Sequence, residues 1–320
     1  MTPHRLVART GDGVHLTVRH FPARKDRAPA VLVVHGFAQN HRAFDVPGRS
    51  LAHHLAEHGV HVFLGELRGR HASHRGAATL PHGFRHYVDE DAPAMLEAVT
   101  RHLGQERVMV LGHSMGGLIC AALPERAARH VAARILLCPP YRFLDWLTVA
   151  RRPLALWMRA VRAGLPLRLP TRMVGPALAA GRALLDLPLP TPLAVWAPGS
   201  VEPDMLEWAL HHSFAWEAWR VLADLLELGA THGERAGRVP VGDRVRALEG
   251  PLLVLAANRD GLAPPRTVEP LYRAAGSREK EYRVLGRELR RGMGHLDAVM
   301  GKHAPAHVWP VLREFLRRVQ

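Results

Sequence analysis

The sequence predicts an α/β fold in which a mostly parallel, doubly wound sheet carries one inserted helical segment. Short apolar runs of strand length alternate with helical patterns along most of the chain. These runs are apolar at nearly every position, which is typical of strands that parallel sheets bury on both faces. The alternation is interrupted once, by a long stretch of helical patterns alone. Strands that alternate with helices favour a doubly wound sheet.

Each element of this sheet has its own residue pattern. Residues 13–20 alternate apolar and polar side chains, as a half-buried strand does. The apolar runs predict buried strands at 30–34, 60–64, 107–111, 134–138 and 252–256, and a further strand is expected at 281–285. Helical patterns predict helices over 43–58, 91–103 and 115–128, and a terminal helix from about 305 to 318.

The interruption divides the chain into three parts. Alternation stops at Pro139-Pro140 and resumes at Gly250-Pro251, so we expect a core over 1–139 and 247–320 and a helical lid over 140–246. Within the lid, a helix is expected over 154–165 behind Pro153 and another over 203–226. Six of the seven tryptophans lie there and either form the lid's own core or line an apolar pocket over the sheet: 146, 157, 196, 208, 216 and 219.

Composition narrows the class of protein. A chain of 320 residues with 48% hydrophobic residues can bury a sizeable core, which excludes a disordered protein. Its two cysteines, Cys120 and Cys138, form no disulfide framework and no metal-ligand spacing, so we expect a reducing, cytoplasmic location. The first 21 residues carry no export signal, and Pro and charged residues break the most apolar later stretch, 173–196.

The formal net charge is +14, which raises the question of anionic partners. The basic residues are almost all arginines scattered along the chain, and no nucleic-acid-binding motif accompanies them. We therefore expect no nucleic-acid partner. Contact of the basic lid helices with an anionic membrane surface stays open.

The most informative stretch is Gly112-His113-Ser114-Met115-Gly116, between a buried strand and a helix. A G-x-S-x-G sequence in this strand-turn-helix setting is typical of a nucleophile elbow, which presents a serine hydroxyl at the carboxyl edge of the sheet. The turn needs small residues at 112 and 116 because the serine backbone is strained and neighbouring strands crowd it. Ser114 is the predicted nucleophile.

An elbow serine needs a base and an acid that orients the base, in the chain order Ser, acid, His. Asp260 lies just past the strand at 252–256, and His295 follows the last strand in a Gly-rich loop. We predict Asp260 as the acid and His295 as the general base. Asp243 and Asp297 compete for the acid role, but Asp243 precedes its strand and Asp297 is spaced to support the histidine loop.

Two other groups of residues have predicted roles. The N–H groups of Phe37 and Met115 are the expected oxyanion donors, one after the strand at 30–34 and one after the nucleophile. His113 is expected to pack and to face away from the reacting centre.

A metal site is not expected, since neither an HExxH motif nor a Cys partner accompanies the histidines of the 71–86 stretch, His71, His74, His82 and His86.

Three segments resemble a known family. Residues 67–73 resemble an RGxxxS turn, residues 87–99 a YxxxDxPAxxxxV helix, and residues 295–305 an HxDxxxGxxAP ending. Together with the elbow they resemble the α/β-hydrolase superfamily, and in particular its acid-lipase-type members and related bacterial esterases and lipases. Met115 stands where the acid lipases carry Gln. Ser114 disfavours related polyester synthases, dehalogenases and epoxide hydrolases, which use Cys or Asp.

The resemblance implies a serine hydrolase that cleaves carboxylic esters of small molecules, with apolar acyl chains, and that needs no cofactor. Acyl transfer by the same three residues and a non-catalytic apolar-ligand-binding protein are the alternatives. The sequence does not determine the acyl chain length, the alcohol, the pathway or the oligomeric state.

Overall fold

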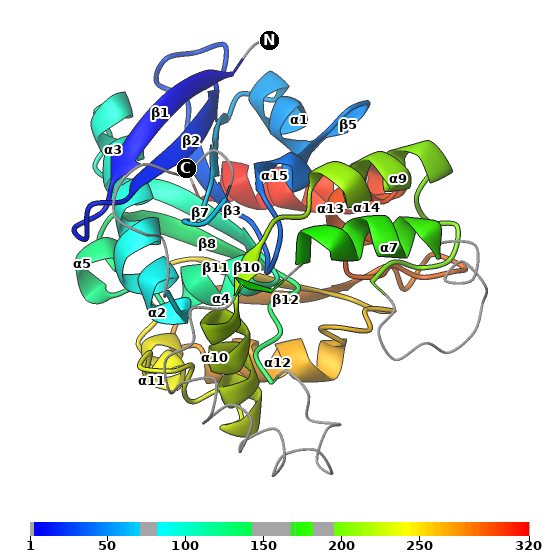
Figure 1. Cartoon of the computed structure of the whole chain (residues 1–320). Coiled ribbons are helices and arrows are strands. Elements are labelled where there is room, and N and C mark those ends of the chain that lie inside the picture. Colours follow the sequence, from blue (N-terminus) through cyan, green and yellow to red (C-terminus); the bar gives the residue numbers. More distant parts are fainter. Residues whose placement is uncertain (1–2, 71–81, 143–167, 170, 182–194, 320) are drawn as a thin grey trace.

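The computed structural model describes residues 3–70, 82–142, 168–169, 171–181 and 195–319. Its centre is an eight-stranded sheet in the order β1-β2-β6-β3-β7-β8-β11-β12 (Figure 1). The first two pairings, β1 with β2 and β2 with β6, are antiparallel, and every other pairing is parallel. The strands are β1 His4–Arg9, β2 His15–Phe21, β3 Ala30–Val34, β6 His61–Gly65, β7 Val108–His113, β8 Val131–Leu137, β11 Leu252–Ala257 and β12 Lys280–Leu285.

The apolar runs of the sequence are the central strands. Every residue of β3, β6, β7 and β11 is buried, as strands covered on both faces require. The sequence analysis did not predict β1, whose residues are mostly exposed because it pairs on one side only, at the edge of the sheet. The α/β-hydrolase fold expected from the resemblance is confirmed.

Helices cover the sheet on both faces (Figure 1). On one face α1 Leu51–Glu57 and α15 Trp309–Arg318 meet through the rings of His54 and Trp309, whose centroids are 4.7 Å apart. A second group of helices is connected by mutual contacts and packs on the sheet. It comprises α3 Ala92–Leu103, α4 Met115–Ala121, α5 Glu125–Ala128, α11 Val241–Arg246 and α12 Pro265–Ala274. In front of α3 the chain forms α2 Phe84–His86 and a π-helical turn, Tyr87–Asp91.

The helix predicted over 43–58 is wrong in its first half. That half is a 3₁₀ turn, His41–Phe44, and a small hairpin of β4 Asp45–Val46 and β5 Arg49–Ser50. Pro47-Gly48 forms the hairpin turn, with Gly48 at a φ of 76° that few other residues adopt. Only α1 Leu51–Glu57 is helical, and the Ser50 hydroxyl caps it by accepting from the His53 N–H.

Two further predicted helices are each divided into two. The helix predicted over 115–128 separates into α4 and α5 around Pro124, which cannot continue a helix. The terminal helix consists of α14 Ala304–His307 and α15 Trp309–Arg318, preceded by α13 Asp297–Met300.

The described parts of the predicted lid are mostly helical. They contain β9 Arg168–Leu169, a 3₁₀ turn at Thr171–Met173, α7 Val174–Ala180, α9 Pro203–His212, β10 Glu217–Ala218 and α10 Trp219–Ala230. The helix predicted over 203–226 is therefore two helices, separated by β10, which pairs with β9. The helix predicted over 154–165 lies outside the described residues.

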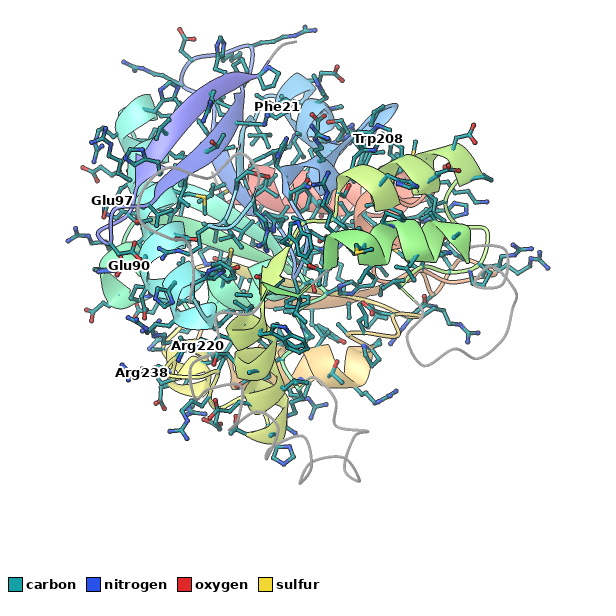
Figure 2. All side chains as sticks on the ribbon, in the orientation of Figure 1. Phe21, Glu90, Glu97, Trp208, Arg220 and Arg238 are labelled. Atoms are coloured by element: carbon teal, nitrogen blue, oxygen red, sulfur yellow. The ribbon has the colours of Figure 1, made fainter. Side chains whose placement is uncertain are left out.

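The lid tryptophans have different surroundings. Trp196 is buried and Trp208 half-buried in a second apolar cluster that also contains Leu206, Leu210 and Leu296. Trp216 is exposed, and Trp146 and Trp157 lie outside the described residues. Figure 2 places Trp208 on α9 and Arg220 on α10, on separate parts of the molecule.

The predicted lid contacts the core in two ways. Apolar residues from 218 to 245 belong to the main hydrophobic core, together with the residues of the central strands. The second apolar cluster instead joins α9 to Leu296 and Met300, next to the loop of the predicted base. The division at 139 and 247 stays a prediction.

Candidate active site

The predicted nucleophile lies in a strained turn. Ser114 follows β7 directly, precedes α4, and has a φ of 56° and a ψ of −123°, an unfavourable region for a residue with a side chain. Its N–H donates to the Leu137 carbonyl at 2.8 Å, which ties the turn to the neighbouring strand β8. The side chain is half-buried, so the hydroxyl can meet a small molecule.

Both elbow glycines are required by close backbone approach. A Cβ on Gly112 would lie 2.1 Å from the Gly116 carbonyl oxygen, and a Cβ on Gly116 would lie 2.1 Å from the Val34 carbonyl oxygen. The crowding that the sequence predicts at 112 and 116 is therefore present. Any larger residue would push α4 away from β7 or β3.

The predicted acid and base are hydrogen-bonded to each other. Asp260 Oδ2 lies 2.6 Å from His295 Nδ1, and both side chains are buried. The other carboxylate oxygen, Oδ1, accepts the backbone N–H groups of Leu262 and Ala263 at 2.8 and 2.7 Å. One oxygen is thus held by the loop after β11, and the other is left to orient the imidazole.

The two competing carboxylates lie elsewhere. Asp243 is exposed on α11 and pairs with Arg246 at 2.7 Å. Asp297 is buried and supports the histidine loop, as its spacing suggested. Its oxygens accept from the N–H of Gly294 at 2.7 Å, the N–H of Ala197 at 2.8 Å and the Ser200 hydroxyl at 2.6 Å. Burial raises the pKa of Asp297, although the three donors lower it.

His113 connects the elbow to the base. It is fully buried, and its ring centroid lies 4.6 Å from that of His295, with Nε2 3.2 Å from the His295 carbonyl oxygen. The expectation that His113 packs is met, but it packs against the predicted base rather than facing away from it. Burial holds the pKa of His113 well below its usual value, so the ring is neutral at pH 7. The Ser114 hydroxyl is not hydrogen-bonded to His295 in this structure.

The two segments that carry the predicted oxyanion donors adjoin Ser114. A Cβ on Gly36 would lie 3.1 Å from the Ser114 Cβ, so the loop after β3 touches the elbow. The Gly36 carbonyl accepts from the Gln39 N–H at 3.3 Å, and in a trans peptide the Phe37 N–H points the opposite way. Met115 is the first residue of α4, where a backbone N–H has no partner within the helix.

A cysteine that the sequence analysis gave no catalytic role adjoins the acid. Cys138 follows β8, and its sulfur lies within 4.8 Å of a carboxylate oxygen of Asp260. Burial, and then the charge of Asp260, raise the pKa of Cys138 well above its usual value, so it stays a thiol. Only the spatial order of the strands brings Cys138 next to Asp260, and no sequence motif contains both.

Candidate metal ligands in the described part of the chain reduce to one group. Ligand atoms of Cys138, Asp260 and His295 lie within 4.8 Å of one another, and no other set of three or more does so there. Of the four histidines considered earlier, His82 is hydrogen-bonded to Tyr87 and His86 to Gly83, and His71 and His74 lie outside the described residues.

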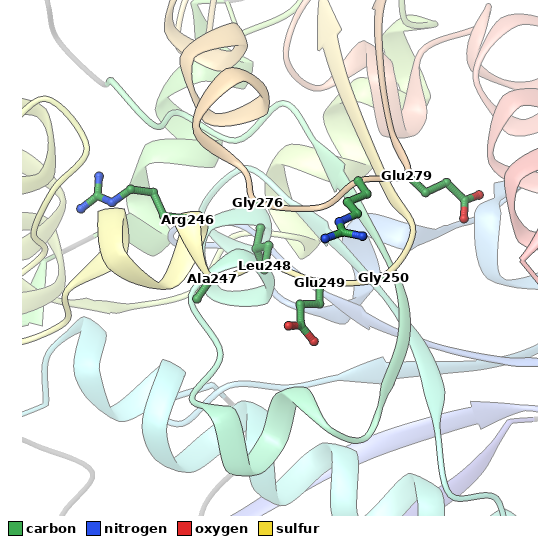
Figure 3. A pocket seen from close by; sticks show the side chains of 8 residues that line it. Arg246, Ala247, Leu248, Glu249, Gly250, Gly276 and Glu279 are labelled. Atoms are coloured by element: carbon green, nitrogen blue, oxygen red, sulfur yellow. The ribbon is translucent and has the colours of Figure 1, made fainter.

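A cleft of about 510 Å³ lies at the opposite edge of the sheet (Figure 3). It is lined by residues 246–250 and by Gly276, Arg278 and Glu279, which precede the amino ends of β11 and β12. Asp260 follows the carboxyl end of β11, so this cleft is separate from the predicted triad. In the described ranges, no helix combines the length and the apolar character needed to cross a membrane.

Comparison with known proteins identifies the family. The family model described as alpha/beta hydrolase fold matches residues 29–286. Lipase 1 of Drosophila melanogaster is 35% identical over 117 residues, which are 33% of this chain and 26% of that lipase. Gastric triacylglycerol lipase of Rattus norvegicus is 30% identical over 149 residues, 41% of this chain and 38% of that lipase. The chain therefore matches well under half the length of these curated relatives.

Solved structures share the fold. A soluble variant of the monoglyceride lipase of Saccharomyces cerevisiae has a TM-score of 0.64 at 17% identity, with 100% of this chain and 97% of that chain covered. A monoacylglycerol lipase of Paleococcus ferrophilus has a TM-score of 0.62 at 16% identity, with coverage of 95% and 99%. With a family model that spans most of its length, this chain belongs to the alpha/beta hydrolase fold family.

Proposed function

We propose that the protein hydrolyses carboxylic esters of small molecules through Ser114, His295 and Asp260. The observation that carries this proposal is the 2.6 Å hydrogen bond between buried Asp260 and His295. Ser114, in its strained turn, directly follows His113, whose ring packs against His295. The names of the relatives, lipases of animals and of microorganisms, agree with ester substrates.

The reaction has two halves. In the first, Ser114 Oγ attacks the ester carbonyl carbon and His295 Nε2 takes the hydroxyl proton; the imidazolium then protonates the departing alcohol, which leaves an acyl-enzyme. In the second, His295 takes a proton from water, the hydroxide attacks the acyl carbonyl, and the proton returns to Ser114 as the acid leaves. Asp260 fixes the histidine tautomer and stabilises the imidazolium, and the Phe37 and Met115 N–H groups stabilise the oxyanion.

Two finer features extend this proposal. An apolar acyl chain suits the apolar residues around the histidine loop, where Trp196 and Leu296 pack together. Contact with an anionic membrane surface suits the exposed run of Arg172, Met173 and Val174 at the start of α7. Co-sedimentation with anionic vesicles at low salt tests the contact, and its absence would contradict the membrane contact but not the ester hydrolysis.

The two free, buried cysteines agree with a reducing, cytoplasmic location.

The test is an activity profile over p-nitrophenyl esters of increasing acyl length, combined with labelling by a fluorophosphonate probe. We expect wild-type turnover and labelling, with a preference for medium or long chains, and loss of both in Ser114→Ala. Ser277→Ala is the matched control, because its buried hydroxyl precedes β12 at the far edge of the sheet. Turnover by Ser114→Ala at the wild-type rate would contradict the proposal.

A further inference from the structure

A buried ion pair contacts the loop after β3, which carries the proposed oxyanion donor Phe37. The reaction described above assigns this ion pair no role. Arg70 Nη2 lies 2.6 Å from Glu217 Oε2, and both side chains are fully buried. Arg70 comes from the loop after β6, whereas Glu217 lies in β10 within the predicted lid, near the centre of the view in Figure 1. A buried ion pair rarely adds stability over apolar residues of the same size, so a specific geometric role is worth seeking.

The pair holds the backbone directly after Phe37. Glu217 Oε2 accepts the Ala38 N–H at 3.1 Å, and Arg70 Nε donates to the Gln39 carbonyl at 2.7 Å. Ala38 has a φ of 56°, a left-handed conformation that is unfavourable for a residue other than glycine. The charged acceptor on its N–H offsets that cost and fixes the turn.

The remaining groups of the pair are also satisfied. Glu217 Oε1 accepts the Tyr87 hydroxyl at 2.6 Å and the Ala218 N–H at 3.0 Å, and Arg70 Nη1 donates to the Trp216 carbonyl at 3.0 Å. Burial by itself would raise the pKa of Glu217, but the charge and hydrogen bonds of Arg70 outweigh it and lower that pKa, so the carboxylate is ionised at pH 7.

The part of the predicted lid just before Glu217 also pairs with the loop after β3, through backbone hydrogen bonds. The Ala215 N–H donates to the Ala38 carbonyl at 2.8 Å, and the Asn40 N–H donates to the Ser213 carbonyl at 3.0 Å. Residues 213–217 therefore lie against residues 38–40 as a short strand would, and the ion pair closes one end of this contact. The Gly36-Phe37 peptide lies between this contact, of residues 213–217 with residues 38–40, and Ser114.

We propose that Glu217, held by Arg70, is a positioning residue that keeps the Phe37 N–H aimed at the oxyanion. This inference rests on the proposed ester hydrolysis, and it makes part of the predicted lid a component of the reaction site. Glu217 does not touch the substrate. It acts through the Ala38 N–H, one peptide beyond the donor itself.

The experiment compares two double variants that both remove the buried charges. Arg70→Met with Glu217→Gln, the amide variant, keeps a side-chain oxygen for the Ala38 N–H. Arg70→Met with Glu217→Met, the thioether variant, does not. Because neither leaves a lone buried charge, both avoid the large penalty of a single removal. Circular dichroism and the melting temperature establish that the two double variants are equally folded.

We expect the thioether variant to have a kcat about tenfold or more below that of the amide variant, with KM changed less than about twofold. A second measurement separates positioning of the donor from a general effect on folding. It is the ratio of kcat/KM for an ester to kcat/KM for the corresponding thionoester, which a loss of folded protein leaves unchanged. Sulfur accepts hydrogen bonds weakly, so a displaced oxyanion donor lowers this ratio, whereas partial unfolding lowers both rates equally.

A second variant keeps the test decisive if the double variants fail to fold. Glu217→Asp retains the charge opposite Arg70 but withdraws the carboxylate by one methylene, and we expect the same fall in kcat and in the ester-to-thionoester ratio. Equal kcat and equal ratios in folded variants would overturn the positioning role and leave ester hydrolysis standing. A wild-type protein inert to every ester and to the fluorophosphonate probe would overturn both.

Discussion

Asp260 Oδ2 and His295 Nδ1 lie 2.6 Å apart, although 35 residues separate them in the chain. The loop after β11 fixes the carboxylate through two backbone N–H groups on its other oxygen. With its Nδ1 proton engaged by Asp260, the neutral imidazole has Nε2 free to accept a proton. This is the tautomer that a general base acting on a serine hydroxyl needs.

Asp260→Asn tests that relationship. The amide keeps the shape of the carboxylate but favours the wrong histidine tautomer and no longer stabilises an imidazolium, so we expect kcat to fall about 10⁴-fold. Steady-state kinetics on a p-nitrophenyl ester measure it. Asp243→Asn, the same change on exposed α11, should leave kcat unaltered. Near wild-type turnover by Asp260→Asn would exclude this carboxylate as the acid.

Much of this architecture was accessible from the sequence because it depends on local signals. The run Ala30–Val34 is a strand with the predicted bounds, since five apolar residues between turns can be buried in few other ways. The nucleophile elbow could also be predicted, because Gly112, Ser114 and Gly116 lie within one short turn and their crowding follows from that turn.

Other features depend on contacts between distant residues. Glu217 follows an exposed tryptophan in a helical region, and nothing in its neighbourhood indicates that Arg70, 147 residues away, pairs with it. Cys138 adjoins Asp260 only because β8 and β11 are neighbours in the sheet. The helix predicted over 43–58 is wrong over 43–50 for the opposite reason: the local turn signal of Pro47-Gly48 prevails over the helical pattern.

Gly116→Ala tests the packing of the elbow. Its new Cβ would lie 2.1 Å from the Val34 carbonyl oxygen, and backbone cannot move aside as a flexible side chain can. We expect the free energy of unfolding to fall by about 3 kcal/mol, measured by urea denaturation. In Gly181→Ala the same methyl group meets nothing closer than 3.5 Å, so its effect should stay within about 0.5 kcal/mol. Equal effects of the two changes would refute the crowding.

The pH dependence of stability has a contribution from His35, the residue before Gly36. Its Nδ1 lies 3.0 Å from the Gly36 carbonyl oxygen, its Nε2 accepts the Leu67 N–H, and burial, together with the charge of Arg70, lowers the pKa of His35 to about 4. Between pH 6.5 and 4 the unfolded chain binds more protons there than the folded one. The stability that His35 contributes is therefore present above pH 6.5 and lost as the pH falls through 4.

His35→Gln isolates this contribution. From pH 7 to pH 5 the wild type should lose about 2 kcal/mol more of its free energy of unfolding than the variant does, whatever the variant's stability at pH 7. Urea denaturation at both pH values measures the difference. Parallel losses in the two proteins would show that His35 titrates normally in the folded state.

The histidine loop should depend on Asp297 more than on any single donor to it. Asp297→Ala leaves the N–H groups of Gly294 and Ala197 and the Ser200 hydroxyl without their acceptor, so we expect a loss of about 3 kcal/mol or more in unfolding free energy. Ser200→Ala removes one of the three bonds and should cost about 1 kcal/mol. Because the Gly294 N–H adjoins His295, Asp297→Ala should also lower kcat, while Ser200→Ala should not. A Ser200→Ala protein as unstable and as slow as Asp297→Ala would mean that the hydroxyl, rather than the carboxylate, holds the loop.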